Sequence, residues 1–266
     1  MTGNEVITDA EHFVTTLPKN CISEKVALDI SVVGMKIFEI PIFAFGAADD
    51  ALFTKYKEAN IIGDSFLTPR EWLPGAKTVI SFFLPFTDRI KKANSKNNDW
   101  PADEWLQARH EGQHFLNELM CHIQKQICEA GYKCLAPSLD SRFSVDNKSI
   151  PNWSERHAAY ACGLGTFGLS KGLITEKGVC GRFGSVLTDL NIGITERRYT
   201  DIYEYCNMCG ICIQNCPAKA ISENGKDSVL CAAFLDKVRE KHSPRYGCGK
   251  CQVDVPCESC IPGKKL

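Results

Sequence analysis

Apolar residues recur at helical spacing in the middle of the chain, and this is the strongest pattern that the sequence contains. We expect a helix over residues 103–130, and Gly131 directly after it is a typical helix stop. The apolar positions that define the helix lie four residues apart and therefore share one face. They are Phe115, Leu119, Ile123 and Ile127.

Shorter patterns on both sides of this helix predict a mixture of strands and helices. A compact apolar run over residues 78–84 follows a Pro-Gly turn and predicts a strand, and residues 32–41 show partial strand alternation. Residues 49–60 begin with two acidic side chains and predict a short helix. The remaining elements are a helix over 154–161, two β-like runs over 172–175 and 183–190, and a polar loop over 94–99.

The composition changes at residues 195–205, where a cysteine-rich segment begins. We therefore expect two domains, a mixed α/β domain over residues 1–195 and a smaller module over residues 196–266. With the strands and helices above, the predicted fold class is α+β. The sequence has no internal repeat of the kind that builds solenoids.

Composition and charge exclude several classes of protein. The chain has 44% hydrophobic and 24% charged residues, which is ordinary for a globular protein. Lys and Arg number 31 and Asp and Glu 32, so the net charge is −1 and no overall basic field favours nucleic acid or an anionic membrane. The longest apolar stretches, residues 37–45 and 79–86, are too short to cross a bilayer. With no export signal at the N-terminus, we expect a soluble, cytoplasmic protein.

The distribution of cysteine is the most informative feature of the composition. The chain has 15 cysteines, and crowded thiols at short spacing in a reducing compartment are typical of metal binding rather than of disulfides. Nine of them fall in the last 61 residues: Cys206, Cys209, Cys212, Cys216, Cys231, Cys248, Cys251, Cys257 and Cys260.

The first four of these cysteines have the spacing C-x2-C-x2-C-x3-C-P, which is the run found in bacterial ferredoxins. Three thiolates at two-residue intervals, Cys206, Cys209 and Cys212, can wrap around one [4Fe–4S] cluster. Cys216, displaced and followed by Pro, ligates the other cluster of a two-cluster module. Zinc ribbons use separated C-x2-C pairs, so the pattern favours two [4Fe–4S] clusters.

The second half of the module is not a copy of the first. By the crossing rule of two-cluster ferredoxins, Cys216 joins Cys231, Cys248 and Cys251 around the second cluster. The first cluster then takes its fourth ligand from Cys257 or Cys260, of which we favour Cys257. A zinc site made of Cys248, Cys251, Cys257 and Cys260 beside a single cluster is the alternative.

A glycine-rich loop follows the helix predicted over residues 154–161. Residues 163–168 read G-L-G-T-F-G, which matches the G-x-G-x-x-G of dinucleotide-binding proteins. That fingerprint needs a strand before it and a helix after it, whereas here a helix precedes and β-like runs follow. Two interpretations stay open besides a dinucleotide site: a tight helix-to-strand connection, or a loop whose backbone approaches another large cofactor.

The segment N-W-S-E-R-H-A-A-Y-A-C-G-L-G-T-F-G-L-S-K-G-L-I-T, followed by F-G-S-V-L-T-D-L, resembles the core of the epoxyqueuosine reductase family. W-L-P-G-A-K-T-V-I, the ferredoxin run and Y-G-C-G-K-C-Q occur in the same order as in that family, whose wider relatives are the reductive dehalogenases. The resemblance implies a nitroreductase-like N-terminal domain, a two-cluster ferredoxin-like module and a cobalamin between them. By position, the cobalamin contacts would be Gly163, Gly165, Gly168, Ser170 and Leu173.

The sequence departs from that family in three places. The family continues into a helical-repeat extension associated with tRNA binding, whereas this sequence ends at Leu266. Ser149 stands where the family's acidic proton donor would align, and C-x5-C with an additional Cys260 replaces C-x3-C-P. From the first departure and the net charge we expect a substrate smaller than tRNA.

The resulting hypothesis is an oxidoreductase that passes electrons from two [4Fe–4S] clusters through cobalamin to a small-molecule substrate, with a ferredoxin or flavodoxin as donor. Two alternatives are a non-catalytic electron-transfer or corrinoid-handling protein, and an epoxyqueuosine reductase that acts on tRNA. Reduction of an epoxide or a carbon–halogen bond needs a general acid. The candidates, none of them favoured, are Asp140, Asp146, His114, His157 and Tyr160.

Overall fold

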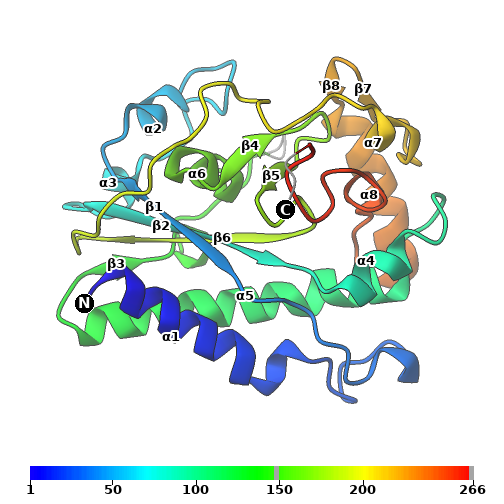
Figure 1. Cartoon of the computed structure of the whole chain (residues 1–266), viewed down its shortest axis with the longest axis horizontal. Coiled ribbons are helices and arrows are strands. Elements are labelled where there is room, and N and C mark those ends of the chain that lie inside the picture. Colours follow the sequence, from blue (N-terminus) through cyan, green and yellow to red (C-terminus); the bar gives the residue numbers. More distant parts are fainter. Residues whose placement is uncertain (147–149, 264–266) are drawn as a thin grey trace.

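A four-stranded antiparallel sheet forms the centre of the molecule. The computed structural model describes residues 1–146 and 150–263. The strands lie in the order β1 (Ile42–Ala47), β2 (Thr78–Pro85), β6 (Gly181–Thr188) and β3 (Cys134–Leu135), and every neighbouring pair is antiparallel (Figure 1). All eight residues of β2 are buried, which explains why this strand reads as one apolar run.

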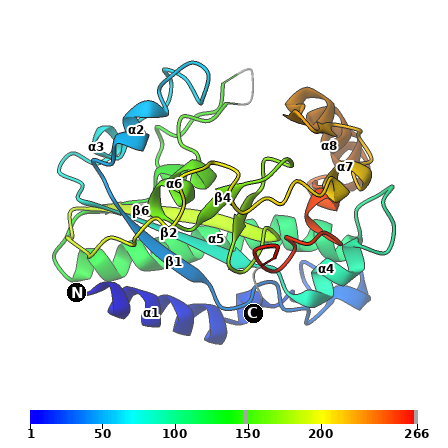
Figure 2. The same ribbon diagram turned by 45° about the horizontal axis from the view of Figure 1, so that its top comes forward.

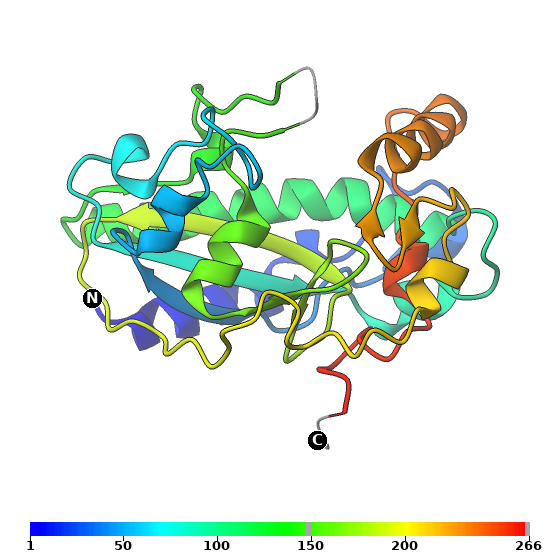
Figure 3. The same cartoon turned by 90° about the horizontal axis from the view of Figure 1, so that it is seen from above.

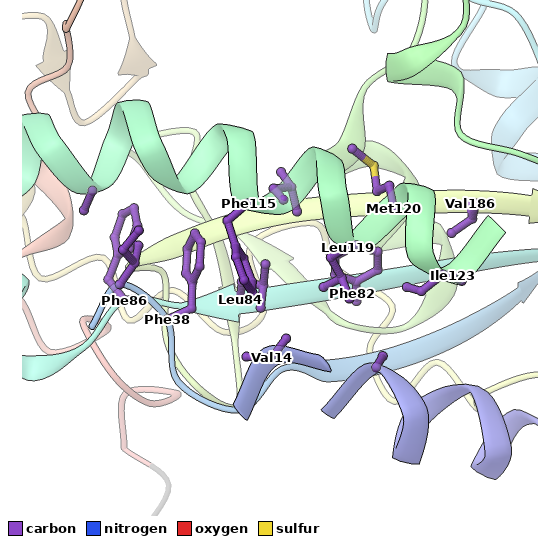
Figure 4. Close-up of a cluster of buried hydrophobic side chains, with 14 of the residues drawn as sticks. Val14, Phe38, Phe82, Leu84, Phe86, Phe115, Leu119, Met120, Ile123 and Val186 are labelled. Carbon is purple, nitrogen blue, oxygen red and sulfur yellow. The ribbon is translucent and has the colours of Figure 1, made fainter. Parts of the chain in front are cut away.

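Two long helices cover one face of the sheet. The helix α5 (Asp103–Glu129) runs along the strands, and α1 (Gly3–Thr16) lies beside it, as Figures 1 and 2 both show. Figure 4 shows the apolar face of α5 packed on side chains of β2 and β6, with Val14 of α1 completing the layer. The short helix α4 (Asp88–Asn94) packs against α5 at one end.

The other face is covered by shorter elements. The helix α6 (Glu155–Cys162) packs on β1, β2 and β6, with α2 (Ala51–Lys55) against it and α3 (Pro69–Trp72) in the same layer. The chain then forms a hairpin of β4 (Gly165–Phe167) and β5 (Leu173–Thr175). A second apolar core fills this layer, in which the ring of Trp153 stacks between those of Phe53 and Phe66.

The cysteine-rich segment folds at one end of the sheet (Figure 3). It contains α7 (Ile211–Gln214), the hairpin of β7 (Ile221–Ser222) and β8 (Gly225–Lys226), and α8 (Ser228–His242). Four short 3-10 turns complete the elements: Pro18–Asn20, Ile30–Val32, Pro137–Leu139 and Lys250–Gln252.

The cysteine-rich segment is attached to the sheet domain through buried polar contacts. Asn94 Nδ2 donates to the carbonyl of Cys248 at 2.9 Å, and Val179 N donates to the carbonyl of Cys257 at 2.9 Å. Gly249 has a φ of +64°, and a Cβ built on it would lie 1.8 Å from the indole of Trp105. Only glycine therefore lets this turn approach the indole so closely.

Most of the predicted elements are present, with shifts at their ends. The expected helices over 103–130 and 154–161 and the strand over 78–84 occur within two residues of their predicted limits. The expectation of a strand over 32–41 is wrong: that segment makes only isolated bridges, and the strand begins at Ile42. The helix expected over 49–60 is confined to Ala51–Lys55, capped by the Asp50 carboxylate, which accepts from Leu52 N.

None of the helices in the described part of the chain combines the length and the apolar character that a membrane span requires.

Candidate iron–sulfur site

Eight of the nine cysteines between residues 206 and 260 line two separate cavities. The first, of about 20 Å³, is lined by Cys206, Cys209, Cys212 and Cys257 together with the loop over residues 168–170. The cysteine run bends tightly here because Met208 and Gly210 both adopt positive φ, and α7 begins directly after this turn. The turn brings three cysteines of a short segment to one point, and Cys257 reaches the same point from the end of the chain.

The second cavity, of about 180 Å³, is lined by Cys216, Cys231, Cys248 and Cys251. Cys216 is buried directly after α7, where its Sγ accepts a hydrogen bond from Ala220 N at 3.3 Å. The opposite wall comes from α5, β6 and the residue after β2, and includes Phe86, Trp105, Arg109, Gly181 and Arg182. Residues from both parts of the chain therefore enclose this cavity.

These two sets of four are the ones that the ferredoxin spacing predicts as ligands, and their role as ligands stays a prediction. Cys260 lines neither cavity, and its Sγ donates to the carbonyl of Pro256 at 3.6 Å. The zinc alternative needs Cys248, Cys251, Cys257 and Cys260 together, but the structure divides them between two places. Among the described residues, no three His, Cys, Asp or Glu side chains form a group that could hold a single metal ion.

Basic side chains surround the second cavity. Its lining includes Arg109, Arg182, Lys226 and Lys250, and the described residues that line it include no Asp or Glu. Lys250 is buried, and its ammonium donates to the carbonyls of Asn94 and Asn97 at 2.6 and 2.7 Å. Burial opposes the charge of Lys226, but the neighbouring Cys251 and Cys231 raise its pKa above the ordinary lysine value. A negative group is therefore favoured in this cavity.

Arg182 on β6 is the basic residue whose hydrogen bonds are least complete. Its Nη2 donates to Gln113 Oε1, whereas its buried Nε has no hydrogen-bond partner. Burial, reinforced by the charge of Arg109, lowers the pKa of Arg182 to about 9, which still leaves the guanidinium charged at neutral pH. An unpaired buried N–H beside a cavity is typical of a site that receives an acceptor from a bound group.

The glycine loop does not form one surface. Gly165 and Leu173 lie at opposite ends of the β4–β5 ladder, where they pair with Thr175 and Phe167, and a Cβ on Gly165 would lie 2.0 Å from the carbonyl oxygen of Ile174. Gly168 and Ser170 border the first cysteine cavity. Gly163 instead borders a different cavity, of about 340 Å³, beside β1. A helix precedes the loop and a hairpin follows it, as expected, which disfavours a dinucleotide site.

The candidate proton donors are scattered, and none of them lines either cysteine cavity. Asp140 pairs with Arg142 at 2.8 Å, and hydrogen bonds from Arg142 lower the pKa of its carboxyl. Burial lowers the pKa of His157 to about 4. His114 lies on α5, Tyr160 on α6, and Asp146 accepts a hydrogen bond from Ile150 N. Ser149, the position aligned with the family's acid, lies outside the described residues.

Sequence reasoning missed Glu155, at the first turn of α6. Its Oε2 accepts a hydrogen bond from Ser185 Oγ at 2.5 Å, and Trp153 Nε1 donates to the same hydroxyl oxygen at 3.0 Å. Burial raises the pKa of Glu155 to about 7, and Oε1 is buried with no hydrogen-bond partner. Only the fold reveals that the carboxyl group of Glu155 is buried, because a glutamate in a first helical turn usually interacts with the helix dipole and solvent.

Comparison with known proteins supports iron–sulfur chemistry. The family model of the 4Fe-4S binding domain matches residues 199–222. The chain is 28% identical over 199 residues to an epoxyqueuosine reductase of Bacillus cereus, an alignment that covers 71% of this chain and 50% of that protein. It is 34% identical over 111 residues to a tetrachloroethene reductive dehalogenase of Desulfitobacterium hafniense, which covers 39% and 20%. The chain is related to the epoxyqueuosine reductases and the reductive dehalogenases.

Solved structures of epoxyqueuosine reductases and reductive dehalogenases share the fold. An epoxyqueuosine reductase with a tRNA-Tyr epoxyqueuosine-modified stem loop aligns with a TM-score of 0.56 and 19% identity, over 99% of this chain and 66% of that one. A catabolic reductive dehalogenase in complex with 3-bromo-4-hydroxybenzoic acid aligns with a TM-score of 0.55 and 16% identity, over 84% and 30%. The chain spans about half the length of the first epoxyqueuosine reductases that it matches.

The prediction of a small-molecule substrate, with tRNA disfavoured, is wrong. The relatives found over most of this chain are epoxyqueuosine reductases, and one protein with the same fold was solved with a tRNA stem loop. The prediction relied on a net charge of −1, which averages over the whole surface. The basic residues of the second cavity show that positive charge is concentrated locally.

The residues assigned to cobalamin do not fit one bound corrinoid as the loop stands. Gly165 and Leu173 are enclosed in their hairpin, and the other three residues border two different cavities. The cobalamin contacts therefore stay a prediction from the resemblance to epoxyqueuosine reductases.

Proposed function

We propose that this protein is an iron–sulfur reductase of the epoxyqueuosine reductase type, which holds two [4Fe–4S] clusters and reduces a modified nucleotide of tRNA. The observation that carries the proposal is the division of eight cysteines into two sets of four, each lining its own cavity. Similarity to epoxyqueuosine reductases over 71% of the chain supports the choice of substrate.

We assign the first cluster to Cys206, Cys209, Cys212 and Cys257, and the second to Cys216, Cys231, Cys248 and Cys251. Four thiolates around one cavity are the donor set of a [4Fe–4S] cluster, and the positive lining of the second cavity suits the negative charge of such a group. When bound, these clusters would supply electrons one at a time at low potential.

The protein's own side chains would perform the remaining tasks. Reductive removal of an epoxide oxygen as water takes two electrons and two protons. Glu155 holds a proton near neutral pH and is hydrogen-bonded to Ser185 on β6, so its carboxyl group could act as a proton donor. Phe86 and Trp105 would exclude water from one side of the second cavity.

The test begins with the full chain purified and reconstituted with iron and sulfide under anaerobic conditions. Iron analysis and an EPR spectrum after reduction by dithionite should show about eight Fe per chain in two clusters. The protein is then incubated with tRNA that carries epoxyqueuosine, and the nucleosides are analysed by mass spectrometry. The proposal expects loss of the epoxide oxygen from the modified nucleoside.

Each stage of this experiment has its own control. Unmodified tRNA should remain unchanged, and reactions with and without added cobalamin test whether that cofactor is required. A ferredoxin or flavodoxin with its reductase can replace dithionite as the donor. Two clusters without turnover under any of these conditions would overturn the reductase proposal and favour the electron-transfer alternative.

A further inference from the structure

The two cysteine cavities differ sharply in the charge of their walls. Arg109, Arg182, Lys226 and Lys250 line the second cavity, whereas the described residues that line the first include no charged side chain. The polar side chains at the first cavity are Ser170 and Asn207, and both are neutral. Two groups with the same four thiolate ligands would therefore experience different electrostatic potentials.

The basic residues of the second cavity are held in place by the fold. Lys250 is fixed by the backbone carbonyl of Asn94, the last residue of α4, and by that of Asn97 in the loop that follows. Arg109 on α5 donates to the hydroxyl of Tyr246 at 3.0 Å, and its guanidinium carbon lies 4.7 Å from the centre of that ring. Gln113 holds one end of Arg182 and leaves the buried Nε without a partner. These charges cannot rearrange as freely as those of surface lysines.

Reduction adds one negative charge to a cluster that is already negative with its four thiolates. Fixed positive charges at the wall stabilise the reduced form more than the oxidised form, and the effect is larger in a buried site than in water. Hydrogen bonds to cluster sulfur act in the same direction.

Resting on the proposed function, we propose that the basic wall raises the reduction potential of the second cluster above that of the first, with Arg182 Nε as a hydrogen-bond donor to its sulfur. With two clusters bound, an electron would then be more stable on the second cluster than on the first.

The test is an EPR-monitored redox titration of the reconstituted full chain with dithionite. Cys257→Ser and Cys251→Ser variants identify which signal belongs to which cluster, because each removes one ligand from only one of the two sets. In Arg182→Gln we expect the ratio of reduced to oxidised second cluster at a fixed potential to fall about tenfold, which is about 59 mV for a one-electron couple. The first cluster should keep its midpoint.

A matched control removes the same charge elsewhere in the module. Lys237 is exposed on α8 and lines neither cavity, so Lys237→Gln should leave both midpoints unchanged. Arg182→Lys keeps the charge without the Nε donor and should produce a smaller shift than Arg182→Gln. If Arg182→Gln loses iron, the titration is repeated with Lys226→Gln, which removes another positive charge from the same cavity wall.

The outcomes separate the two proposals. If the parent binds two clusters that titrate together, or if the second is reduced at a lower potential than the first, this inference is wrong while the cluster assignment stands. Equal shifts of both clusters in Arg182→Gln also contradict it. If the parent cannot hold more than about four Fe, the proposed function itself fails.

Discussion

The two cysteine cavities are built from the same ligand type but in different ways. The first consists of a seven-residue run, Cys206–Cys212, closed by Cys257 and bordered by the loop before β5, and Cys209 is exposed. The second is larger, about 180 against 20 Å³, and a quarter of its lining residues come from Phe86, α5 and β6. The first cavity combines cysteines with the loop between β4 and β5, whereas the second combines them with α5 and β6, which contribute two arginines.

This difference shows that ligand spacing and ligand environment are separate properties of an iron–sulfur protein. The spacing of the cysteines decides which thiolates can come together, and each of the two cavities is lined by four cysteines. The surroundings decide what a bound cluster would do, because charge and burial set its potential. Among the described lining residues, the second cavity alone receives charged side chains from another part of the fold.

The largest expected effect is the loss of one cluster, which tests whether the two cavities bind clusters independently. Cys257→Ser should remove the first cluster and with it about four of about eight Fe, because the first cavity then has only three thiolates. Cys260→Ser is the matched control, since Cys260 lines neither cavity and its loss should leave the iron content unchanged. Iron and sulfide analysis of both variants is the measurement. The opposite result would make Cys260 the ligand.

A glycine substitution tests whether the second cavity depends on the contact between Gly249 and Trp105 of α5. Gly249→Ala forces a Cβ toward the indole of Trp105 at a positive φ and should reduce the free energy of unfolding by about 3 kcal/mol. Gly210→Ala has a similar φ of +74°, but its new Cβ would only contact Ile213 Cδ1 at 3.9 Å, so about 1 kcal/mol is expected. Thermal unfolding and EPR should show selective damage to the second cluster in Gly249→Ala. Equal losses in both variants would show that the contact with Trp105 is unimportant.

The buried carboxyl of Glu155 predicts a pH-dependent difference in stability. Its pKa is about 7 in the folded protein and about 4.3 in an unfolded chain, so the unfolded chain binds fewer protons between these values. Its contribution to stability is therefore lost as pH rises from about 4.3 to 7, and the penalty is constant above that range. Glutamine does not titrate, so the difference in unfolding free energy between Glu155→Gln and the parent should increase by about 2 kcal/mol, in favour of the variant, as the pH rises from 5 to 8.

The measurement for this prediction is Tm at pH 5, 6, 7 and 8 for both proteins. Glu223→Gln, at an exposed position after β7, should follow the parent at every pH. A gain in Glu155→Gln that is the same at pH 5 and pH 8 would contradict the assignment of a raised pKa.

The smallest effect concerns the loop beside the first cavity. Ser170 is buried, and its Oγ accepts a hydrogen bond from Gly172 N at 3.2 Å, so Ser170→Ala should cost about 1 kcal/mol of stability. Ser222 makes the same kind of turn bond to Asn224 N at 3.2 Å but is exposed, so Ser222→Ala should cost less. Thermal unfolding of both variants is the check. A larger loss in Ser222→Ala would show that burial does not control this bond.

Sequence patterns predicted the elements that have one clearly apolar face or are buried on both faces. The helix α5 and the strand β2 are of this kind, and both were found where expected. The strand β1 was misplaced because residues 32–41 alternate in polarity without pairing, whereas Phe43 and Gly46 lie in the real strand. The helices α1 and α8 were not predicted, and α8 buries only Val238 among its residues, so it carries little apolar pattern.

The grouping of the cysteines into two sets of four could be predicted from their spacing, but the surroundings of the two cavities could not. The run Cys206–Cys216 is local, and its chemistry can be read from a short segment. Arg109 and Arg182 are far from it in the chain, and nothing in their own neighbourhoods marks them as part of a site. The partner was predicted wrongly for the same reason, since net charge contains no information about where the charges meet.

The attachment of Gly249 to Trp105 has a consequence for how the protein is assembled. The three cysteines of the Cys206–Cys212 run can approach one another within a short loop, which costs little chain entropy. The second cavity forms only when α5 and β6 have already folded and the C-terminal turn has docked on them, which requires contacts between distant segments and is slower. Folding should therefore determine the order of iron loading: the first site gains its local cysteines early, and the second becomes complete only in the finished molecule.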